Sequence, residues 1–541
     1  MEQDELVRWL AAPGVLPGSA DGVEVRETHA SVVFLTRDRA FKLKKPVNFG
    51  FLDYGTPGRR LRMCRREVAL NRRLAPGVYL GVRAVREGPG GAPCIGGRGR
   101  MIDHVVEMRR RADADSLAAR LARGEAGEAE CRAVAAVIAR FHANAPSGEA
   151  RRGRVPAVRV SVMENFRQLA EMPGVAMPTE FQAALRAKAA GFLHGSRSVL
   201  AGRADAGAVR ECHGDLRAEH VYLTASDGIE VIDCIEFNRR LSEIDVAADI
   251  AFLVMDVAAA GHWHEAGAIA EEYRERSGDT LEAVLEFYTA YRAVVRAKVA
   301  GLFATGRAPG DPARENALIE ARRYAWTALE FATPPRRPVL AITGGLTGTG
   351  KSWLAEPLAA ALAAERLNAD RVRKELGGVP AGVHVPAGPD EGLYRPEMNM
   401  AVYGALLERA AAALGAGRNV VLDGTFRREG DRAAAAAVAA AAGARFFAIE
   451  CTAPADEVRR RLDRRQAEGS DPWSDGRWEV YLAQAARAEP WRESDGPNGI
   501  RVDTAAPRVT ALDTVLTAMA RAFGLLGEEG GGPASAAGPP R

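Results

Sequence analysis

Apolar and polar positions follow two patterns along the chain, and the change comes near residue 335. In the segment GVEVRETHASVVFLTRDRAFKLKK (22–45), short alternating runs predict three strands, with TRDR as a hairpin connection. A helical spacing follows in RRLRMCRREVALNRRLAP, where Pro76 helps to end the helix. From about Asp113 to Glu330 the pattern is mostly helical, apart from strand candidates in HVYL and IEVID. This order predicts a small β-rich lobe joined to a larger helical lobe.

The downstream pattern alternates apolar strands with Ala-rich helices. Strands are predicted at VLAIT, NVVLDGTF and ARFFAIECTAP, and a helix at KSWLAEPLAAALAAE (351–365). Such alternation favours a parallel sheet covered by helices. The predicted fold class is therefore a two-domain one, an α+β fold followed by a parallel-sheet α/β fold.

Proline and glycine clusters mark the predicted domain boundaries. The prolines in ATPPRRP break the upstream helical pattern, and the stretch GEEGGGPASAAGPPR offers little apolar surface to bury. We expect a first domain over residues 1–332, a linker over 333–337, a second domain over 338–526 and a disordered tail over 527–541.

The charge balance gives no general signal for nucleic acid or an anionic membrane as a partner, because 73 basic residues stand against 70 acidic ones. The six cysteines lack a CxxC pair, which is typical of reduced thiols. The N-terminus has no secretory-signal pattern, and the most apolar helix candidate, from Ile250, is too short to span a bilayer. We therefore expect a cytoplasmic protein, and the sequence leaves its oligomeric state open.

The stretch GLTGTGKS (345–352) fits the phosphate-loop pattern G-x-x-x-x-G-K-S, and it lies between an apolar strand and a helix. Glycines let backbone N–H groups turn around phosphate oxygens, and the helix N-terminus adds a favourable dipole. Lys351 is expected to hold the β- and γ-phosphates of ATP, and the Ser352 hydroxyl to ligate Mg²⁺. The predicted nucleotide-binding residues here are Gly345, Thr347, Gly348, Thr349, Gly350, Lys351 and Ser352.

Four charged residues are candidates to complete this site. Asp423 ends a buried-strand pattern, from which its carboxylate can reach the Mg²⁺ shell. Asp370 precedes RVRKEL and either caps that helix or orients an acceptor hydroxyl. Arg461 and Arg465 lie four residues apart on one helical face, which fits phosphate-clamping arginines in a lid as well as solvated arginines.

These residues resemble the small P-loop kinases, a group that includes gluconate kinases, polynucleotide 5′-kinases and zeta-toxin-like enzymes. The resemblance covers about Val339 to Thr504, and the phosphate loop is its specific part. It implies ATP-dependent transfer to a hydroxyl acceptor, either a small molecule or a nucleic-acid end.

A second set of motifs, CHGDLRAEH and VIDCIEF, looks like the catalytic and metal-binding loops of a kinase. In phosphotransferases with a protein-kinase-like fold, Asp215 would orient the acceptor hydroxyl and Asp233 would hold Mg²⁺. His220 stands where that pattern expects Asn. Since Mg²⁺ prefers oxygen ligands, its expected role is open between an outer-shell contact, a ligand for another metal and a structural hydrogen bond.

Lys42 in AFKLKK is placed on the third predicted strand, as expected for a lysine that contacts the α- and β-phosphates of ATP. Glu67 on the following helix is its expected partner. The neighbouring Lys44 and Lys45 leave the choice of lysine open.

This half resembles the aminoglycoside phosphotransferase and choline-kinase-like superfamily over about Val23 to Phe331. The phrases FKLKKPVNFGFLDY, CHGDLRAEH and DCIEFN are similar to a bacterial branch in which such a domain is fused to a P-loop domain. The resemblance implies a bilobal protein-kinase-like fold that uses ATP and Mg²⁺. Asp249 is expected either to brace the catalytic loop or to cap its helix.

The prediction is a bifunctional ATP-dependent phosphotransferase with one site in each half. Two alternatives remain open. One is a single P-loop kinase or ATPase that the first half regulates, and the other is a nucleotide-controlled interaction module without catalysis.

Overall fold

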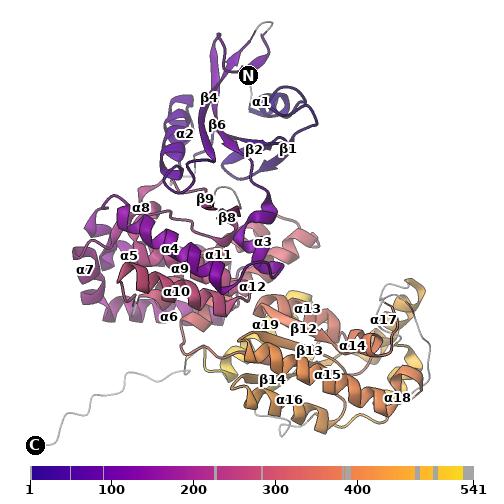
Figure 1. The fold of residues 1–541 in the computed structure, drawn as a ribbon. Helices are drawn as coiled ribbons and strands as arrows, with labels where there is room; N and C mark the ends of the chain where they lie inside the picture. Colours follow the sequence, from indigo (N-terminus) through magenta and orange to yellow (C-terminus); the bar gives the residue numbers. More distant parts are fainter. Residues whose placement is uncertain are drawn as a thin grey trace, which may run out of the picture. The chain divides into compact units, whose positions relative to one another are not determined.

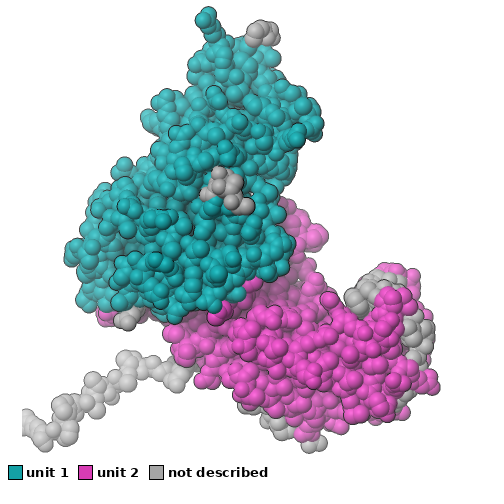
Figure 2. Space-filling model, viewed as in Figure 1, with its two compact units in different colours: residues 1–159, 196–257, 265–288 teal, residues 160–195, 258–264, 289–541 magenta. Residues whose placement is uncertain are grey.

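The computed structural model describes residues 3–48, 50, 52–88, 91–224, 228–281, 284–380, 383, 391–468, 476–491 and 498–527. The chain divides into two compact units (Figure 2). The first consists of residues 1–159, 196–257 and 265–288, and the second of residues 160–195, 258–264 and 289–541. The predicted domain boundaries, including the linker at 333–337, stay predictions. All but the first residue of the predicted tail lie outside the described residues.

The first unit begins with a six-stranded antiparallel sheet in the order β1-β2-β3-β6-β4-β5 (Figure 1). The three predicted strands are confirmed as β1 to β3, whereas β4 to β6 were not predicted individually. A helix, α2, follows β3. The bounds are α1 Gln3–Leu10, β1 Glu24–Glu27, β2 Ser31–Leu35, β3 Arg39–Lys44, α2 Pro57–Asn71, β4 Tyr79–Glu87, β5 Pro93–Ile95 and β6 Met101–Arg109.

The alternation of side chains along β3 gives the sheet two different faces. Phe41 and Leu43 are fully buried and pack with Leu6 and Leu10 of α1. Ala40 points to the opposite face, where it packs with Cys64 of α2. Because side chains two positions apart share a face, Lys42 and Lys44 lie on the α2 side of the sheet.

Mainly helical sequence follows up to residue 331, as predicted, with two short antiparallel strand pairs, β7–β10 and the hairpin β8–β9. Helices α6 and α12 belong to the second unit. The helices are α3 Leu117–Ala122, α4 Glu128–Asn144, α5 Val155–Ala170, α6 Thr179–Gly195, α7 Arg197–Asp205, α8 Arg239–Ser242, α9 Val246–Ala259, α10 Trp263–Ser277, α11 Leu285–Thr305 and α12 Pro312–Phe331. The strands are β7 Val209–Glu211, β8 Val221–Thr224, β9 Gly228–Val231 and β10 Glu243–Asp245.

The second unit contains the predicted parallel sheet, in the order β12-β13-β11-β14-β15, with helices packed around it (Figure 1). Its strands are β11 Val339–Gly344, β12 Ala364–Asn368, β13 Asn419–Asp423, β14 Arg445–Thr452 and β15 Gly499–Asp503. Its helices are α13 Lys351–Leu362, α14 Ala369–Leu376, α15 Pro396–Gly415, α16 Glu429–Ala441, α17 Ala455–Glu468, α18 Trp478–Ala485 and α19 Arg508–Ala522.

Two strands of this sheet were not predicted. The helix that was expected over 351–365 is too long by three residues, because α13 ends at Leu362 and Ala363 takes the left-handed conformation with φ 47°. The next five residues form the edge strand β12, in which only Leu367 is buried. Strand β15 forms the other edge.

Candidate functional sites

The phosphate-loop sequence forms a tight turn between β11 and α13. Gly345, Gly348 and Gly350 have φ angles of 131°, 78° and 84°, a region that disfavours other residues. A Cβ atom on Gly345 would lie 2.4 Å from the Cys451 carbonyl oxygen, and one on Gly350 would lie 2.7 Å from Thr504 Oγ1. The backbone therefore curves as a cradle that only glycine permits, which fits a bound phosphate chain.

Donors of this loop are paired within the protein. The Thr347 N–H donates to Gln484 Oε1 over 2.8 Å, and Lys351 Nζ donates to the Leu346 carbonyl oxygen over 2.7 Å. Burial lowers the pKa of the Lys351 ammonium. A phosphate group would replace a neutral carbonyl by a negatively charged partner, so the loop is suited to an anion.

Asp423 ends β13 beside the phosphate loop, as predicted. Parallel pairing sets Thr343 of β11 opposite Asp423 on one side and Asn368 of β12 opposite it on the other. Its carboxylate is 2% exposed, and Oδ2 accepts hydrogen bonds from Arg366 Nη2 at 2.6 Å and Asn368 Nδ2 at 2.8 Å. Among the described residues these bonds leave Oδ1 unused, and they fix the orientation of the carboxylate.

One pocket of about 1230 Å³ joins the phosphate loop to the acidic and basic candidates. Among its lining residues are these predicted ones: Thr347, Gly348, Gly350, Lys351, Ser352, Asp370, Asp423, Arg461 and Arg465. Gly345 and Thr349 shape the loop and do not line the pocket. Arg366 and Asn368, which donate hydrogen bonds to Asp423, also line the pocket.

The cap alternative for Asp370 is wrong. The N-cap of α14 is Asn368, whose side-chain oxygen accepts the Arg371 N–H over 2.9 Å. Asp370 lies in the first turn, and its Oδ1 accepts a hydrogen bond of 2.8 Å from Arg373 Nη1. Its place in the pocket wall leaves the alternative of an acceptor contact.

Arg461 and Arg465 lie on one face of α17, as predicted, and both line the pocket. Arg461 Nη1 donates to Thr504 Oγ1 over 2.9 Å, and its Nη2 to the Thr504 carbonyl oxygen over 2.8 Å. Arg465 Nη2 lies 3.4 Å from the Gly476 carbonyl oxygen. Arg461 is thus held against Thr504, the residue that a Cβ atom on Gly350 would contact.

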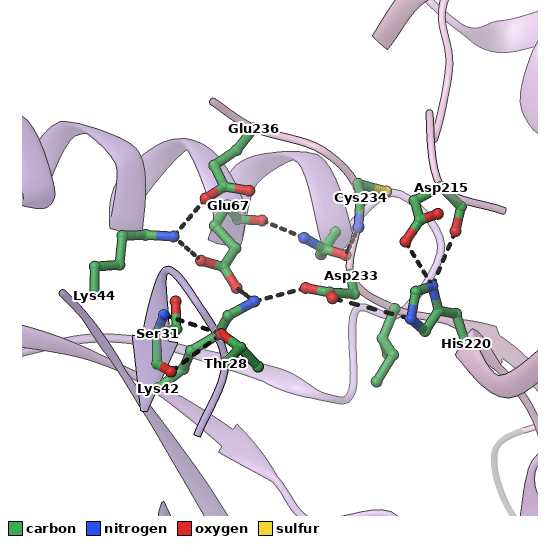
Figure 3. A network of polar contacts seen from close by, with 12 residues as sticks. Thr28, Ser31, Lys42, Lys44, Glu67, Asp215, His220, Asp233, Cys234 and Glu236 are labelled. Carbon is green, nitrogen blue, oxygen red and sulfur yellow. Dashed lines mark hydrogen bonds and ion pairs between the residues drawn. The ribbon is translucent and has the colours of Figure 1, made fainter. Parts of the chain in front are cut away.

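In the first unit, Lys42, Glu67 and Asp233 meet in one network (Figure 3). Lys42 Nζ lies 2.6 Å from Asp233 Oδ1 and 3.0 Å from Glu67 Oε1. Burial acts to lower the pKa of Lys42, but the carboxylates of Asp233 and Glu67 outweigh it, so this pKa is well above its usual value. The lysine stays charged, as a contact to phosphate requires.

Lys44 has a different role from Lys42, although both contact Glu67. Lys44 is 1% exposed and lies 2.6 Å from Glu67 Oε2, and its ammonium also pairs with Glu236. Lys45 pairs with Glu27. Lys42 is the lysine that joins Glu67 to Asp233, so the geometry favours Lys42 as the phosphate contact.

The turn that carries Asp233 is held by residues of the small lobe. Asp233 has a φ of 69°, a left-handed conformation that Asp tolerates better than most residues. Its N–H donates to Tyr79 Oη over 3.2 Å, and the next N–H, of Cys234, donates to Asn71 Oδ1 over 2.9 Å. Asn71 is fully buried and lies one turn after Glu67 on α2. Helix α2 therefore positions both Lys42 and the Asp233 turn.

Asp249 braces the loop that contains Asp215, and it does not cap a helix. Its carboxylate accepts the His213 N–H at 2.9 Å and the Gly214 N–H at 2.8 Å, and it lies 3.0 Å from His142 Nε2. Burial acts to raise the pKa of Asp249, but the hydrogen bond and charge of His142 and the contacts of His213 lower it to about 2. The brace alternative of the sequence analysis is confirmed.

His220 forms the structural hydrogen bond that was one of its alternatives. Its Nδ1 lies 2.9 Å from the Asp215 carbonyl oxygen, and its Nε2 lies 3.0 Å from Arg217 Nη2. Arg217 also donates to both carboxylate oxygens of Asp215 at 3.2 Å. Because an arginine can only donate, Nε2 is the acceptor, and its lone pair points to Arg217. A metal-ligand role for His220 stays a prediction.

Several residues that hold these sites together were missed in the sequence. Arg217 stands inside the CHGDLRAEH motif, where its charge opposite Asp215 is a usable signal. Asn71 follows Glu67 at a helical spacing of four, which puts both on one face of α2. Arg366 and Asn368 gave no signal, because β12 itself was not predicted.

No helix among the residues that the structure describes has both the length and the apolar character needed to cross a membrane.

Fold and site together define the second unit as one that contains a P-loop α/β domain. A family model described as an AAA domain matches residues 340–490. The chain is 36% identical over 492 residues to uncharacterized protein Mb2027c of Mycobacterium bovis and to uncharacterized protein Rv2004c of Mycobacterium tuberculosis. Each match covers 90% of this chain and 93% of the relative. The chain belongs to the same family as these two proteins.

Solved structures are similar to parts of the chain at lower identity. A choline/ethanolamine kinase family protein from Mesorhizobium loti is 13% identical, with 61% of this chain and 99% of that chain covered and a TM-score of 0.35. The APS kinase CysC of Mycobacterium tuberculosis is 20% identical, with coverages of 34% and 99% and a TM-score of 0.25. A gluconokinase from Sinorhizobium meliloti is 18% identical, with coverages of 35% and 95% and a TM-score of 0.25.

Proposed function

We propose that the P-loop site transfers the γ-phosphate of ATP to a hydroxyl acceptor. The observation that carries the proposal is that one pocket contains the phosphate-loop lysine Lys351, the strand-end carboxylate Asp423 and the further carboxylate Asp370. A site that only binds nucleotide needs the first two. The additional carboxylate in the same pocket is what an acceptor hydroxyl requires for orientation.

The residues have distinct tasks in this proposal. Lys351 and the loop N–H groups bind the phosphates, and Arg461 and Arg465 offset the charge on the transferred group. Ser352 and Asp423 would hold Mg²⁺, which neutralises phosphate charge when bound. Asp370 orients the acceptor, and its pairing with Arg373 keeps its carboxylate fixed. Most of the rate enhancement would come from positioning and charge.

Transfer of label from γ-labelled ATP tests this proposal. The chain is incubated with Mg²⁺ and a pooled panel of hydroxylated metabolites, aminoglycosides and 5′-hydroxyl oligonucleotides. The wild type is expected to form a labelled product that Lys351→Ala does not form. Tight ATP binding without any labelled product would instead support the non-enzymatic interaction module.

A second phosphotransferase site in the first unit is favoured by the Lys42–Glu67–Asp233 network (Figure 3). Lys42 would bind the α- and β-phosphates of ATP, and Asp215 would orient the acceptor. The donor set, with the Asp233 carboxylate beside a charged lysine, fits Mg²⁺, whose bound charge would neutralise phosphate oxygens. Arg217 offsets part of the charge on Asp215.

The same labelling experiment separates one site from two. If Asp215→Asn and Lys351→Ala each remove a different labelled product, the chain is a bifunctional phosphotransferase. If Lys351→Ala loses all transfer and Asp215→Asn keeps it, the first unit is a regulator of the P-loop enzyme. We place both reactions in the cytoplasm, with a small molecule or a nucleic-acid end as acceptor.

A further inference from the structure

The turn after β13 has a strained conformation at a buried aromatic residue. Phe426 is fully buried and has a φ of 43°, where a bulky side chain is rarely found. Three contacts hold the turn. Tyr403 Oη accepts the Phe426 N–H at 3.0 Å, Arg432 Nη1 donates to the Phe426 carbonyl oxygen at 2.9 Å, and the Gly345 N–H donates to the Thr425 carbonyl oxygen at 3.0 Å. The turn is thereby attached to the phosphate loop.

This turn brings Arg427 and Arg428 to the wall of the same pocket as Asp370. Two other arginines of that wall pair with carboxylates, Arg366 with Asp423 and Arg373 with Asp370. Within the described part of the chain, the Arg427 and Arg428 side chains have neither a hydrogen bond nor an ion pair. Their guanidinium groups are available to a ligand.

The charge of the pocket points to the same kind of ligand. Its lining side chains include ten basic and five acidic ones. Lys351, Arg461 and Arg465 account for charge on the nucleotide side. Asp431 also lines the pocket near the two arginines. Burial raises the pKa of its carboxyl, which disfavours the charged form that would neutralise the arginines. The lining therefore has a positive excess, to which Arg427 and Arg428 contribute.

We propose that Arg427 and Arg428 bind an oxyanion of the acceptor, a carboxylate or a phosphate, while Asp370 orients its hydroxyl. The acceptor of the P-loop site is then a hydroxylated anion. Planar guanidinium groups suit such an oxyanion because they can donate two parallel hydrogen bonds to it. This inference rests on the proposed phosphotransfer at the P-loop site, and it excludes polycationic aminoglycosides as acceptors there.

Anion binding to the full chain with the nucleotide site filled tests the inference. The protein is first saturated with Mg²⁺ and AMPPNP, a non-hydrolysable ATP analogue, so that the phosphate loop itself is occupied. Inorganic phosphate, gluconate and neutral sorbitol are then titrated calorimetrically. The tested variant is Arg427→Gln/Arg428→Gln. The matched control is Arg460→Gln, since the Arg460 side chain is 76% exposed on α17 and does not line the pocket.

We expect phosphate or gluconate to bind the wild type and Arg460→Gln, and to bind the double variant about 10- to 100-fold more weakly. The tighter of the two anions identifies the oxyanion, and sorbitol should not bind. AMPPNP affinity should be the same in all three proteins. Nucleotide binding without anion binding, or equal anion affinity in the double variant, overturns this inference alone. Absence of the AMPPNP binding that Lys351→Ala removes would overturn the proposed P-loop function and this inference with it.

Discussion

The Lys42 ammonium lies 2.6 Å from Asp233 Oδ1, although 191 positions separate the two residues in the chain. Glu67 completes the contact from α2, at 3.0 Å from the same ammonium. Strand β3, the helix α2 that follows it and the distant Asp233 turn thus meet at one charged group. Such convergence in a partly open position, with the Lys42 side chain 16% exposed, is expected of a ligand site and not of a core.

The two lysines of β3 should respond differently to the same substitution. Lys44→Met leaves Glu67 and Glu236 buried without their shared partner, which should lower the free energy of unfolding by about 3–5 kcal/mol. Lys42→Met should mainly weaken ATP binding at this site. Denaturant unfolding and nucleotide titration of both variants check this. Equal stability of Lys44→Met and the wild type would show that the contacts of Lys44 with Glu67 and Glu236 do not stabilise the fold.

Asn71→Leu should loosen the Asp233 turn. The substitution leaves the buried Cys234 N–H without its acceptor, at a cost of about 1–3 kcal/mol, and we expect a higher Mg²⁺ requirement for nucleotide binding. Asn144→Ala is the matched control, because that exposed asparagine donates its hydrogen bond within its own helix, to the Arg140 carbonyl oxygen. Mg²⁺ titrations of nucleotide affinity that coincide for the two variants would refute the role of Asn71.

Asp249 should make the first unit sensitive to acid. Its pKa of about 2 in the folded chain lies below its ordinary value of 3.8, so the stabilisation is present above about pH 4 and is lost as the pH falls toward 2. The difference corresponds to about 2 kcal/mol. Asp249→Asn should be less stable near neutral pH and lack this part of the pH dependence. Unfolding curves measured from pH 6 to about pH 2 decide the point.

Gly350→Ala should abolish nucleotide binding at the phosphate loop. At a φ of 84°, its Cβ atom would lie 2.7 Å from Thr504 Oγ1, so either the loop or its neighbour must move. Gly404→Ala is the matched control, since a Cβ atom there meets nothing within 4 Å inside α15. The control should gain about 0.5–1 kcal/mol of stability and bind nucleotide normally. Normal nucleotide binding by Gly350→Ala would contradict the conclusion that the phosphate loop needs glycine at this position.

The sequence predicted the first-unit network except for the choice of lysine. The alternation of β3 places Lys42 and Lys44 on the same face, and both reach Glu67. The position of the Asp233 turn, which depends on Tyr79 and Asn71, and the contact of Lys44 with Glu236 distinguish them. Those contacts join separate elements, so no local pattern contains them.

The phosphate loop and Asp423 were predicted because each is fixed by its own strand end. The wall around Asp370 was not, because β12 has a single buried position and follows an Ala-rich helix without a glycine stop. Arg366 and Asn368 reach Asp423 only through parallel pairing, which the sequence does not display. Arg427 and Arg428 depend in turn on the left-handed Phe426, which is unusual for that residue type.

The number of Mg²⁺-dependent nucleotide sites per chain tests the central claim of two phosphotransfer sites without knowledge of either acceptor. Equilibrium dialysis with labelled AMPPNP should give two sites for the wild type, one for Lys351→Ala and one for Lys42→Met. A single site in the wild type that Lys351→Ala removes and Lys42→Met leaves intact would contradict the account and reduce the first unit to a scaffold or regulator.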